Sequence, residues 1–300
     1  MRRRFVVPVL WCVLSAVMAG TVGVPTSHDL VFVWVASGMV AFSAAQLRRR
    51  WARFLVEWAP FMGVLFVYDR LRGIADGLVF PAHALAQVHG DLALGVVPTV
   101  WLQDHLWHGA GHIEPWDYAV WFIYVTHFFG TLFVAGALWL WWHDRFARFA
   151  TMVCALALAG FATYVLYPAE PPWLAARHGD IGRANRIVAI VWPHVPLAHY
   201  GSLFEKGQTY ANNVAAMPSL HAAYALLICL CLWRYVRPRW RPVLALYPPA
   251  MAFALIYTGE HYLVDCVAGW VYAGATYFAV NWWFERRRVR VPAYEPVYAD

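Results

Sequence analysis

Two histidines and one aspartate in the last third of the chain are the side chains best suited to chemistry. His261 and Asp265 stand four residues apart, so on a helix they share one face. A carboxylate at that spacing can hold one imidazole nitrogen as N–H and leave the other nitrogen to attack an electrophile. His221 can supply or remove a proton. The three residues therefore predict an oriented nucleophile with an acid–base partner.

The segment that leads to His221 has the features of an anion site. Pro218 suits the first position of a helix, where its missing N–H costs nothing, and Ser219 adds a hydroxyl donor. The N–H groups and the positive dipole end of a helix N-terminus attract anions, phosphate above all. Combined with the two imidazoles, this segment predicts phosphoryl transfer.

The elements that must position these residues are membrane helices. Of the 300 residues, 62% are hydrophobic and 13% are charged, and the mean hydropathy is +0.50. Soluble domains average about 45–50% and about 25% on a similar count, so a soluble fold is excluded. The net charge of +6 is carried by short Arg clusters between apolar runs, a pattern typical of membrane orientation and not of nucleic-acid binding.

Eight apolar runs are candidates for transmembrane helices, because a bilayer core of about 30 Å needs about 20 residues of helix. The runs cover roughly residues 5–23, 29–46, 54–69, 118–142, 149–168, 218–236, 242–258 and 261–284. The sequence therefore predicts an all-α polytopic membrane protein with about eight transmembrane helices. Two N-terminal helices (1–53) would precede a six-helix catalytic domain (54–290) and a short tail (291–300).

The basic residues predict which way this protein faces. With eight spans and a cytoplasmic N-terminus, every Arg cluster falls on the cytoplasmic side. These clusters lie at 2–4, 48–53, 145–148, 234–241 and 286–290. We therefore expect a multi-pass protein of the plasma (inner) membrane with both termini in the cytoplasm. The starts of the sixth and eighth helices, with His221 and His261, would then lie at the outer face.

At these residues the sequence resembles the type 2 phosphatidic acid phosphatase superfamily. The motifs that carry the resemblance are Pro218-Ser219-Leu220-His221 and His261-x3-Asp265. The fuller segments 217–221, 261–265 and 167–173 look closest to the inositol phosphorylceramide synthase branch and its bacterial relatives. The resemblance covers roughly residues 160–280 and extends weakly to 68–73 and 98–103.

The resemblance implies a metal-independent mechanism through a phosphohistidine, without a cofactor. His261 would be the nucleophile and Asp265 its orienting partner. His221 would protonate the leaving alkoxide and then deprotonate the acceptor, while Ser219 would bind a phosphate oxygen. The substrate would be a membrane lipid phosphate ester or phosphodiester, and the acceptor an inositol hydroxyl, a sugar hydroxyl or water.

The sequence departs from the phosphatase pattern at its cationic positions. Ala254 and Leu255 stand where that pattern has Ser-Arg, and the first phosphatase motif, Lys-x6-Arg-Pro, is absent. A phosphoryl group with two charges needs cationic partners, which the arginines of the outer segments must then supply. The candidates are Arg70, Arg72 and Arg186, followed by Arg183.

Two other interpretations were weighed. Intramembrane His and Asp also serve proton relays, so the alternative is a proton-coupled transporter or a lipid flippase. That alternative predicts ionisable residues near the bilayer midplane and related halves of the chain, whereas the sequence shows no repeat. The spacing of His105, His108 and His112 could suggest a metal, but no acidic or Cys ligand completes the set, so we expect no metal.

Overall fold

The computed structural model describes residues 3–21, 28–43, 47–74, 80–195 and 212–287. These residues form helices joined by turns, and the only extended pairing described among them is a pair of isolated β-bridges. The predicted all-α class is therefore confirmed. The predicted tail at 291–300 lies outside the described residues.

Each predicted span corresponds to one helix. These helices are α1 (Arg3–Thr21), α2 (His28–Ser43), α3 (Leu47–Ile74), α6 (Pro115–Trp141), α7 (His143–Leu166), α11 (Leu220–Leu232), α12 (Arg241–Tyr257) and α13 (Leu263–Arg287). Among the described residues, α6, α7 and α13 are long and apolar enough to cross a bilayer, so the chain is a membrane protein. Whether the other five helices cross, and where the domain boundaries lie, stay predictions.

The third helix is longer than the predicted span. The apolar run 54–69 is extended at both ends by residues that favour helix, among them the Arg cluster at its start. Hydropathy marks the part of a helix that lies in lipid, not the whole helix, and this explains the difference.

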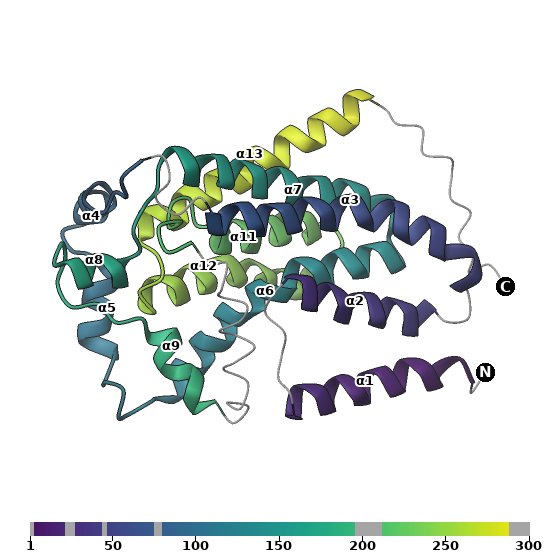
Figure 1. Cartoon of the computed structure of the whole chain (residues 1–300), viewed down its shortest axis with the longest axis horizontal. Coiled ribbons are helices and arrows are strands. Elements are labelled where there is room, and N and C mark those ends of the chain that lie inside the picture. The colour runs from purple at the N-terminus through teal and green to yellow at the C-terminus, as the bar shows by residue number, and fades with distance from the viewer. Residues whose placement is uncertain (1–2, 22–27, 44–46, 75–79, 196–211, 288–300) are drawn as a thin grey trace.

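Short helices gather at one end of the bundle. Figure 1 shows α4 (Leu85–Leu92), α5 (Pro98–Leu106), α8 (Pro172–His178) and α9 (Ile187–Val191) together at the end where α11 and α13 begin. The 3-10 turn η2 (Trp192–His194) continues α9, and a second turn, η4 (Pro238–Trp240), precedes α12. The start of α1 and the end of α13 point the opposite way. The short helices thus cover one end of the bundle, the end at which α11 and α13 begin.

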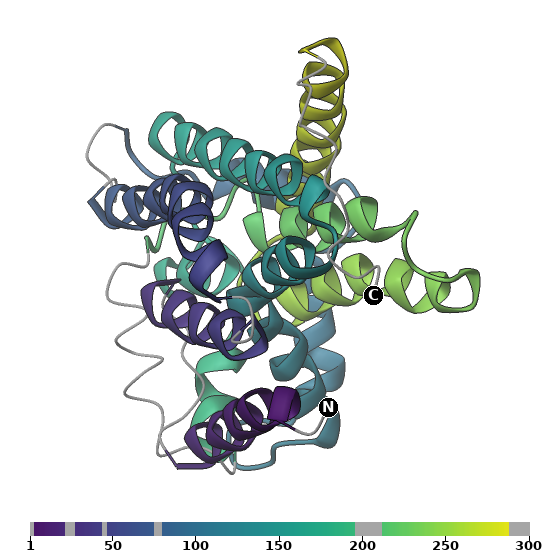
Figure 2. The ribbon, with the colours of Figure 1, turned by 90° about the vertical axis from the view of Figure 1, so that its right-hand side faces the viewer.

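The central helix of the bundle is α11. It packs against α12, α13, α6 and α7, and its Ala222, Ala223 and Leu227 are fully buried. The outermost helix, α1, packs against α2, and Figure 2 shows α1 and α13 on opposite sides of the bundle. Residues at the start of α11 are therefore enclosed on several sides by protein.

Candidate active site

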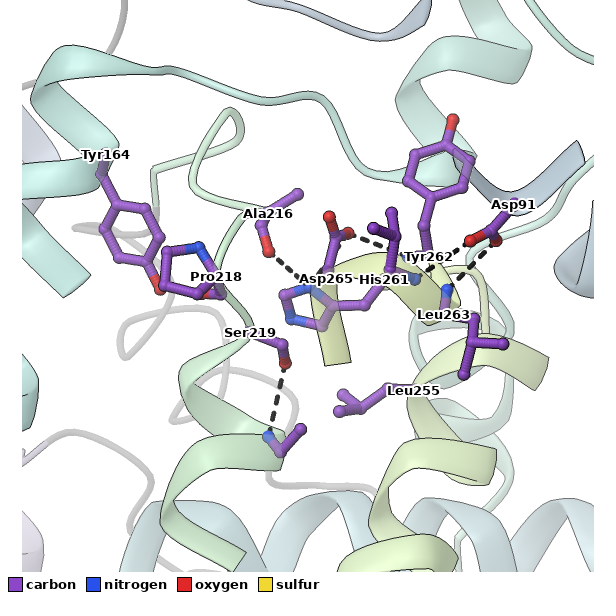
Figure 3. Close-up of polar contacts among 12 residues, drawn as sticks. Asp91, Tyr164, Ala216, Pro218, Ser219, Leu255, His261, Tyr262, Leu263 and Asp265 are labelled. Carbon is purple, nitrogen blue, oxygen red and sulfur yellow. Dashed lines mark hydrogen bonds and ion pairs between the residues drawn. The ribbon is translucent and has the colours of Figure 1, made fainter. Parts of the chain in front are cut away.

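His261 lies in the turn between α12 and α13 and is only 5% exposed. The first N–H groups of α13, those of Leu263 and Val264, donate to the carboxylate of Asp91 in α4 at 3.1 and 3.0 Å (Figure 3). Burial raises the pKa of the Asp91 carboxyl, while these two hydrogen bonds lower it. A carboxylate is favourable at a helix N-terminus, so Asp91 fixes the point from which His261 projects.

The imidazole of His261 is oriented by a backbone carbonyl. Its Nδ1 lies 2.9 Å from the carbonyl oxygen of Ala216 and 3.7 Å from Oδ2 of Asp265 (Figure 3). A carbonyl can only accept, so Nδ1 carries the proton and Nε2 presents its lone pair. Asp265, predicted as the orienting partner, is at ion-pair range but beyond a hydrogen bond. Its Oδ2 accepts from the Tyr262 N–H at 2.9 Å instead.

Ala216 is held in place by β-bridges and hydrogen bonds between neighbouring backbone segments. Ala169 forms parallel bridges with His83 on one side and with Ala215 on the other. The Ala216 N–H donates to the Ala169 carbonyl at 3.1 Å, and the Tyr164 hydroxyl donates to the Pro218 carbonyl at 2.8 Å. The segment 167–173, which carried part of the resemblance, therefore supports the segment that orients His261.

His221 comes from a different helix and reaches the same place. Its ring centroid lies 5.5 Å from that of His261, with the rings inclined at 59°. Tyr124 of α6 stacks on the His221 ring, with the ring centroids 5.2 Å apart and an angle of 18° between the planes. The ring centroid of His127, also from α6, lies 3.8 Å from that of His221. The structure thus brings together two imidazoles that are distant in sequence.

Ser219 is the N-cap of α11 and is fully buried. Its hydroxyl oxygen accepts from the Ala222 N–H at 3.3 Å, and its own N–H donates to the Asp265 carbonyl at 3.0 Å. This close approach of α11 and α13 requires Gly269, because a Cβ there would overlap the Ser219 carbonyl oxygen. The expectation that Pro218 takes the first helical position is wrong, since the cap formed by Ser219 makes α11 begin at Leu220.

Arg186 is the predicted cation whose described contacts run to Glu260 and Tyr124, each a neighbour of one of the two histidines. Its Nε and a terminal nitrogen donate to the two oxygens of Glu260, the residue before His261, at 2.7 and 3.3 Å. It also lies beside the hydroxyl of Tyr124, which stacks on His221. Burial lowers the pKa of Arg186, but Glu260 outweighs burial and raises it, so the side chain stays a cation. Its guanidinium covers the ring of Trp173 at 5.0 Å.

The other predicted cations are placed differently. Arg70 lies on α3 with its guanidinium 4.7 Å from the ring of Phe66, one turn earlier on the same helix. The side chain of Arg72 lies outside the described residues. Arg183 is exposed. Of the four predicted cations, Arg186 is the one whose described contacts reach residues next to the imidazoles.

A comparison with protein-family models decides the family. The PAP2 superfamily model matches residues 88–279, which include every residue of this site. The chain belongs to the PAP2 superfamily. This agrees with the resemblance drawn from the motifs at His221 and His261. No solved structure matches the chain.

One curated relative adds to the family assignment. This PAP2 superfamily member is 32% identical over 139 residues to the phosphoinositol dihydroceramide synthase of Bacteroides thetaiotaomicron. The match covers 41% of the chain and 42% of that protein, so the chain spans less than half of the relative's length. The relative agrees with the inositol phosphorylceramide synthase-like branch that the motifs indicated.

Sequence reasoning missed several residues of this PAP2 site. Asp91 caps α13 from 172 residues away, and the Ala216 carbonyl orients His261 across 45 residues. Glu260 and Tyr124 hold Arg186. Gln103 of α5, whose amide bonds to the backbone of Asn185 and Tyr257, had a signal in the sequence, because it ends the stretch 98–103 to which the resemblance extended.

Within the part of the chain that the structure describes, two groups of side chains have donor atoms that could hold a cation. The expectation that no acidic residue completes the histidine set is wrong. The turn before α6 brings the same Glu114 oxygen to 2.9 Å from His108 Nδ1 and 3.0 Å from His112 Nε2. The second group is Glu170, His178 and Asp180. Neither group includes His221 or His261.

Proposed function

We propose that this PAP2 superfamily member is an integral membrane enzyme that transfers the phosphoryl or phosphodiester group of a lipid through a phosphohistidine on His261. The observation that carries the proposal is the meeting of His221 and His261, with ring centroids 5.5 Å apart. The family and the named activity of the relative both support phosphoryl transfer as the reaction class.

The first step forms the bond between Nε2 of His261 and phosphorus. The Nε2 lone pair attacks, the bond from phosphorus to the lipid alkoxide breaks, and His221 gives its proton to that alkoxide. Nucleophile and leaving group must lie roughly in line through phosphorus. Two imidazoles that approach each other from α11 and from the turn before α13 suit this requirement.

The second step returns the enzyme to its starting state. His221, now neutral, takes the proton of the acceptor hydroxyl while that oxygen attacks phosphorus, and the bond to His261 breaks. Arg186 and Ser219 are the proposed ligands of the phosphoryl oxygens, and Arg186 supplies a fixed positive charge. Arg70 and Arg72 stay candidates for a wider cationic ring. Asp265 completes the proposed machinery as an ion-pair partner of His261.

The acceptor distinguishes a transferase from a phosphatase. The departures at Ala254 and Leu255, together with a relative named as a synthase, favour transfer to an inositol or sugar hydroxyl over transfer to water. The proposed partners are thus a membrane lipid and a polyol. The proposal involves no nucleic acid.

The test uses the purified full chain in detergent with two labelled probes. Phosphatidic acid labelled in its phosphate is incubated with and without inositol, and labelled phosphatidylinositol with and without dihydroceramide. Transfer should give acceptor-dependent inositol phosphate from phosphatidic acid and inositol, or an acceptor-dependent phosphodiester from phosphatidylinositol and dihydroceramide. Release to water alone, as free phosphate from phosphatidic acid or inositol phosphate from phosphatidylinositol, would indicate a hydrolase. No product from any probe would overturn the proposal. Lipid movement across vesicles that survives in a His221→Ala/His261→Ala variant would instead support the transporter alternative.

The proposed orientation places the site at the outer face. Two exposed arginines offer a matched pair for labelling: Arg183, three residues before Arg186, and Arg239, in η4. In intact cells a membrane-impermeant maleimide should label Arg183→Cys, and it should label Arg239→Cys only after lysis. The reverse pattern would put the site on the cytoplasmic side.

A further inference from the structure

One buried glutamine outside the proposed machinery joins two distant segments of the site. Gln103 of α5 is 3% exposed. Its Nε2 donates to the carbonyls of Asn185 and Tyr257, both at 2.9 Å. Its Oε1 accepts from the Asn185 N–H at 2.7 Å. All the strong bonds of this side chain therefore go to backbone that is 82 and 154 residues away.

Both segments lead directly to proposed catalytic or binding groups. Asn185 immediately precedes Arg186, and Tyr257 ends α12 four residues before His261. On the far side of Arg186, the Ile187 N–H donates to the Thr258 carbonyl at 3.1 Å. The backbone of Arg186 is thus fastened on both sides to the turn that carries His261.

Gly259 makes this contact sterically feasible. Its φ of +78° lies in the left-handed region, and a Cβ there would lie 2.5 Å from the Asn185 carbonyl oxygen. Only glycine lets the loop before Arg186 rest on the turn. The side-chain amide of Gln103 then joins this loop to the end of α12, because an amide can both donate and accept hydrogen bonds.

We propose that Gln103 is a positioning residue that sets the distance between the Arg186 guanidinium and the imidazole of His261. This inference rests on the proposed role of Arg186 as a phosphate ligand. Gln103 touches neither substrate nor the reacting atoms. It acts by holding the loop that carries Arg186 in the position where the guanidinium can donate to the carboxylate of Glu260. A carboxylate at position 103 would lose the two donated bonds, and a thioether would lose all three.

The experiment is a double-mutant cycle in the full-length protein. Gln103→Met keeps the length of the side chain and removes its polar atoms, and Gln103→Glu keeps its shape. Each variant should lower kcat/KM about 10- to 100-fold, because small misplacements of a binding group have effects of that size. Arg186→Ala should lower it about 100-fold or more. The positioning role predicts that adding Gln103→Met to Arg186→Ala lowers kcat/KM by less than about threefold further.

Gln87 offers the matched control. It is a second buried glutamine, in α4, and its amide nitrogen donates to the nearby carbonyls of His83 and Ala84, just before that helix begins. Gln87→Met should lower the melting temperature about as much as Gln103→Met while kcat/KM stays within about threefold of wild type. Equal losses of activity in the two variants would show a merely structural role and overturn the proposal.

The outcomes separate this inference from the proposed function. Independent, multiplying losses from Gln103→Met and Arg186→Ala would refute the positioning role and leave Arg186 as a phosphate ligand. Wild-type activity in Arg186→Ala would refute both. If Gln103→Met does not fold, Gln103→Glu carries the same cycle, and wild-type kcat/KM in that variant also refutes the inference.

Discussion

The middle of the bundle and the end that holds the two imidazoles differ in what they bury. Between α3, α6 and α7 the buried side chains are large and apolar, among them Trp58, Leu132, Phe146 and Leu156. At the end that holds the imidazoles, buried polar side chains lie among the apolar ones. Among the described residues, every buried polar side chain except Thr131 lies in α4, α5, the first turn of α6 or the segments around His221 and His261.

The difference concerns how position is specified. Apolar packing is non-directional, so many side chains of similar volume can fill the middle of the bundle. At the polar end, each group is placed by particular hydrogen bonds, such as the bond from His261 to Ala216. We therefore expect substitutions at the polar end to change catalysis more than stability, and substitutions in the middle to do the reverse.

The largest effect should come from His261→Gln. This change removes the proposed nucleophile and should lower turnover by about 10⁴-fold or more. Glutamine keeps a polar side chain of similar reach, so the melting temperature in detergent should stay close to that of the wild type. Product formation from the labelled lipid measures the loss. Turnover within tenfold of wild type would remove His261 from the mechanism.

His221→Gln should follow, with a loss of about 10²–10⁴-fold on a lipid substrate because the alkoxide then departs without a proton. A nitrophenyl phosphate ester has a leaving group that needs no proton. The burst of nitrophenol that accompanies formation of the intermediate should therefore be largely restored. An equal loss of that burst would contradict the acid role of His221.

Asp91→Ala should have an intermediate effect. The start of α13 would lose its cap, which costs about 1–2 kcal/mol of stability. Turnover should fall about tenfold, because the turn that carries His261 would no longer be held in one position. Asp91→Asn keeps one acceptor oxygen and should lose less. The exposed His89, on the same helix, provides the control His89→Ala. Unchanged turnover in Asp91→Ala would mean that the cap does not position the site.

Leu156→Ala should have the smallest effect on catalysis. This side chain is fully buried between helices, so its truncation leaves a cavity and should cost about 2 kcal/mol or more. The melting temperature should drop by several degrees, while kcat of the folded fraction stays within about twofold. A tenfold loss of kcat without a change in melting temperature would break the contrast between the two regions.

Much of this architecture could be predicted from local sequence. The apolar runs located the eight helices that were predicted, because a helix meant to lie in lipid needs a continuous apolar segment whatever its neighbours are. The meeting of His221 and His261 could also be predicted from their motifs, in which Ser219 and Asp265 lie close to them in sequence. What was predicted correctly depends on residues within one or two helical turns.

The remainder depends on contacts that no local pattern records. Asp91 and Gln103 are single polar residues in short helices, and their partners are backbone groups far along the chain. Choosing Arg186 over Arg70 required the position of Glu260, which the loop brings to it only in the folded chain. Spacing alone likewise could not show that Glu114 turns back onto His108 and His112.

The central claim is that His261 carries the phosphoryl group between two partners. The direct measurement is to mix the enzyme with lipid labelled in its phosphate, quench at alkaline pH within a turnover, and map the label by mass spectrometry of peptides. The account predicts an acid-labile phosphohistidine at His261 that is absent in His261→Gln and disappears when acceptor is added. Full turnover with no label on His261, or with label on another residue, would contradict it.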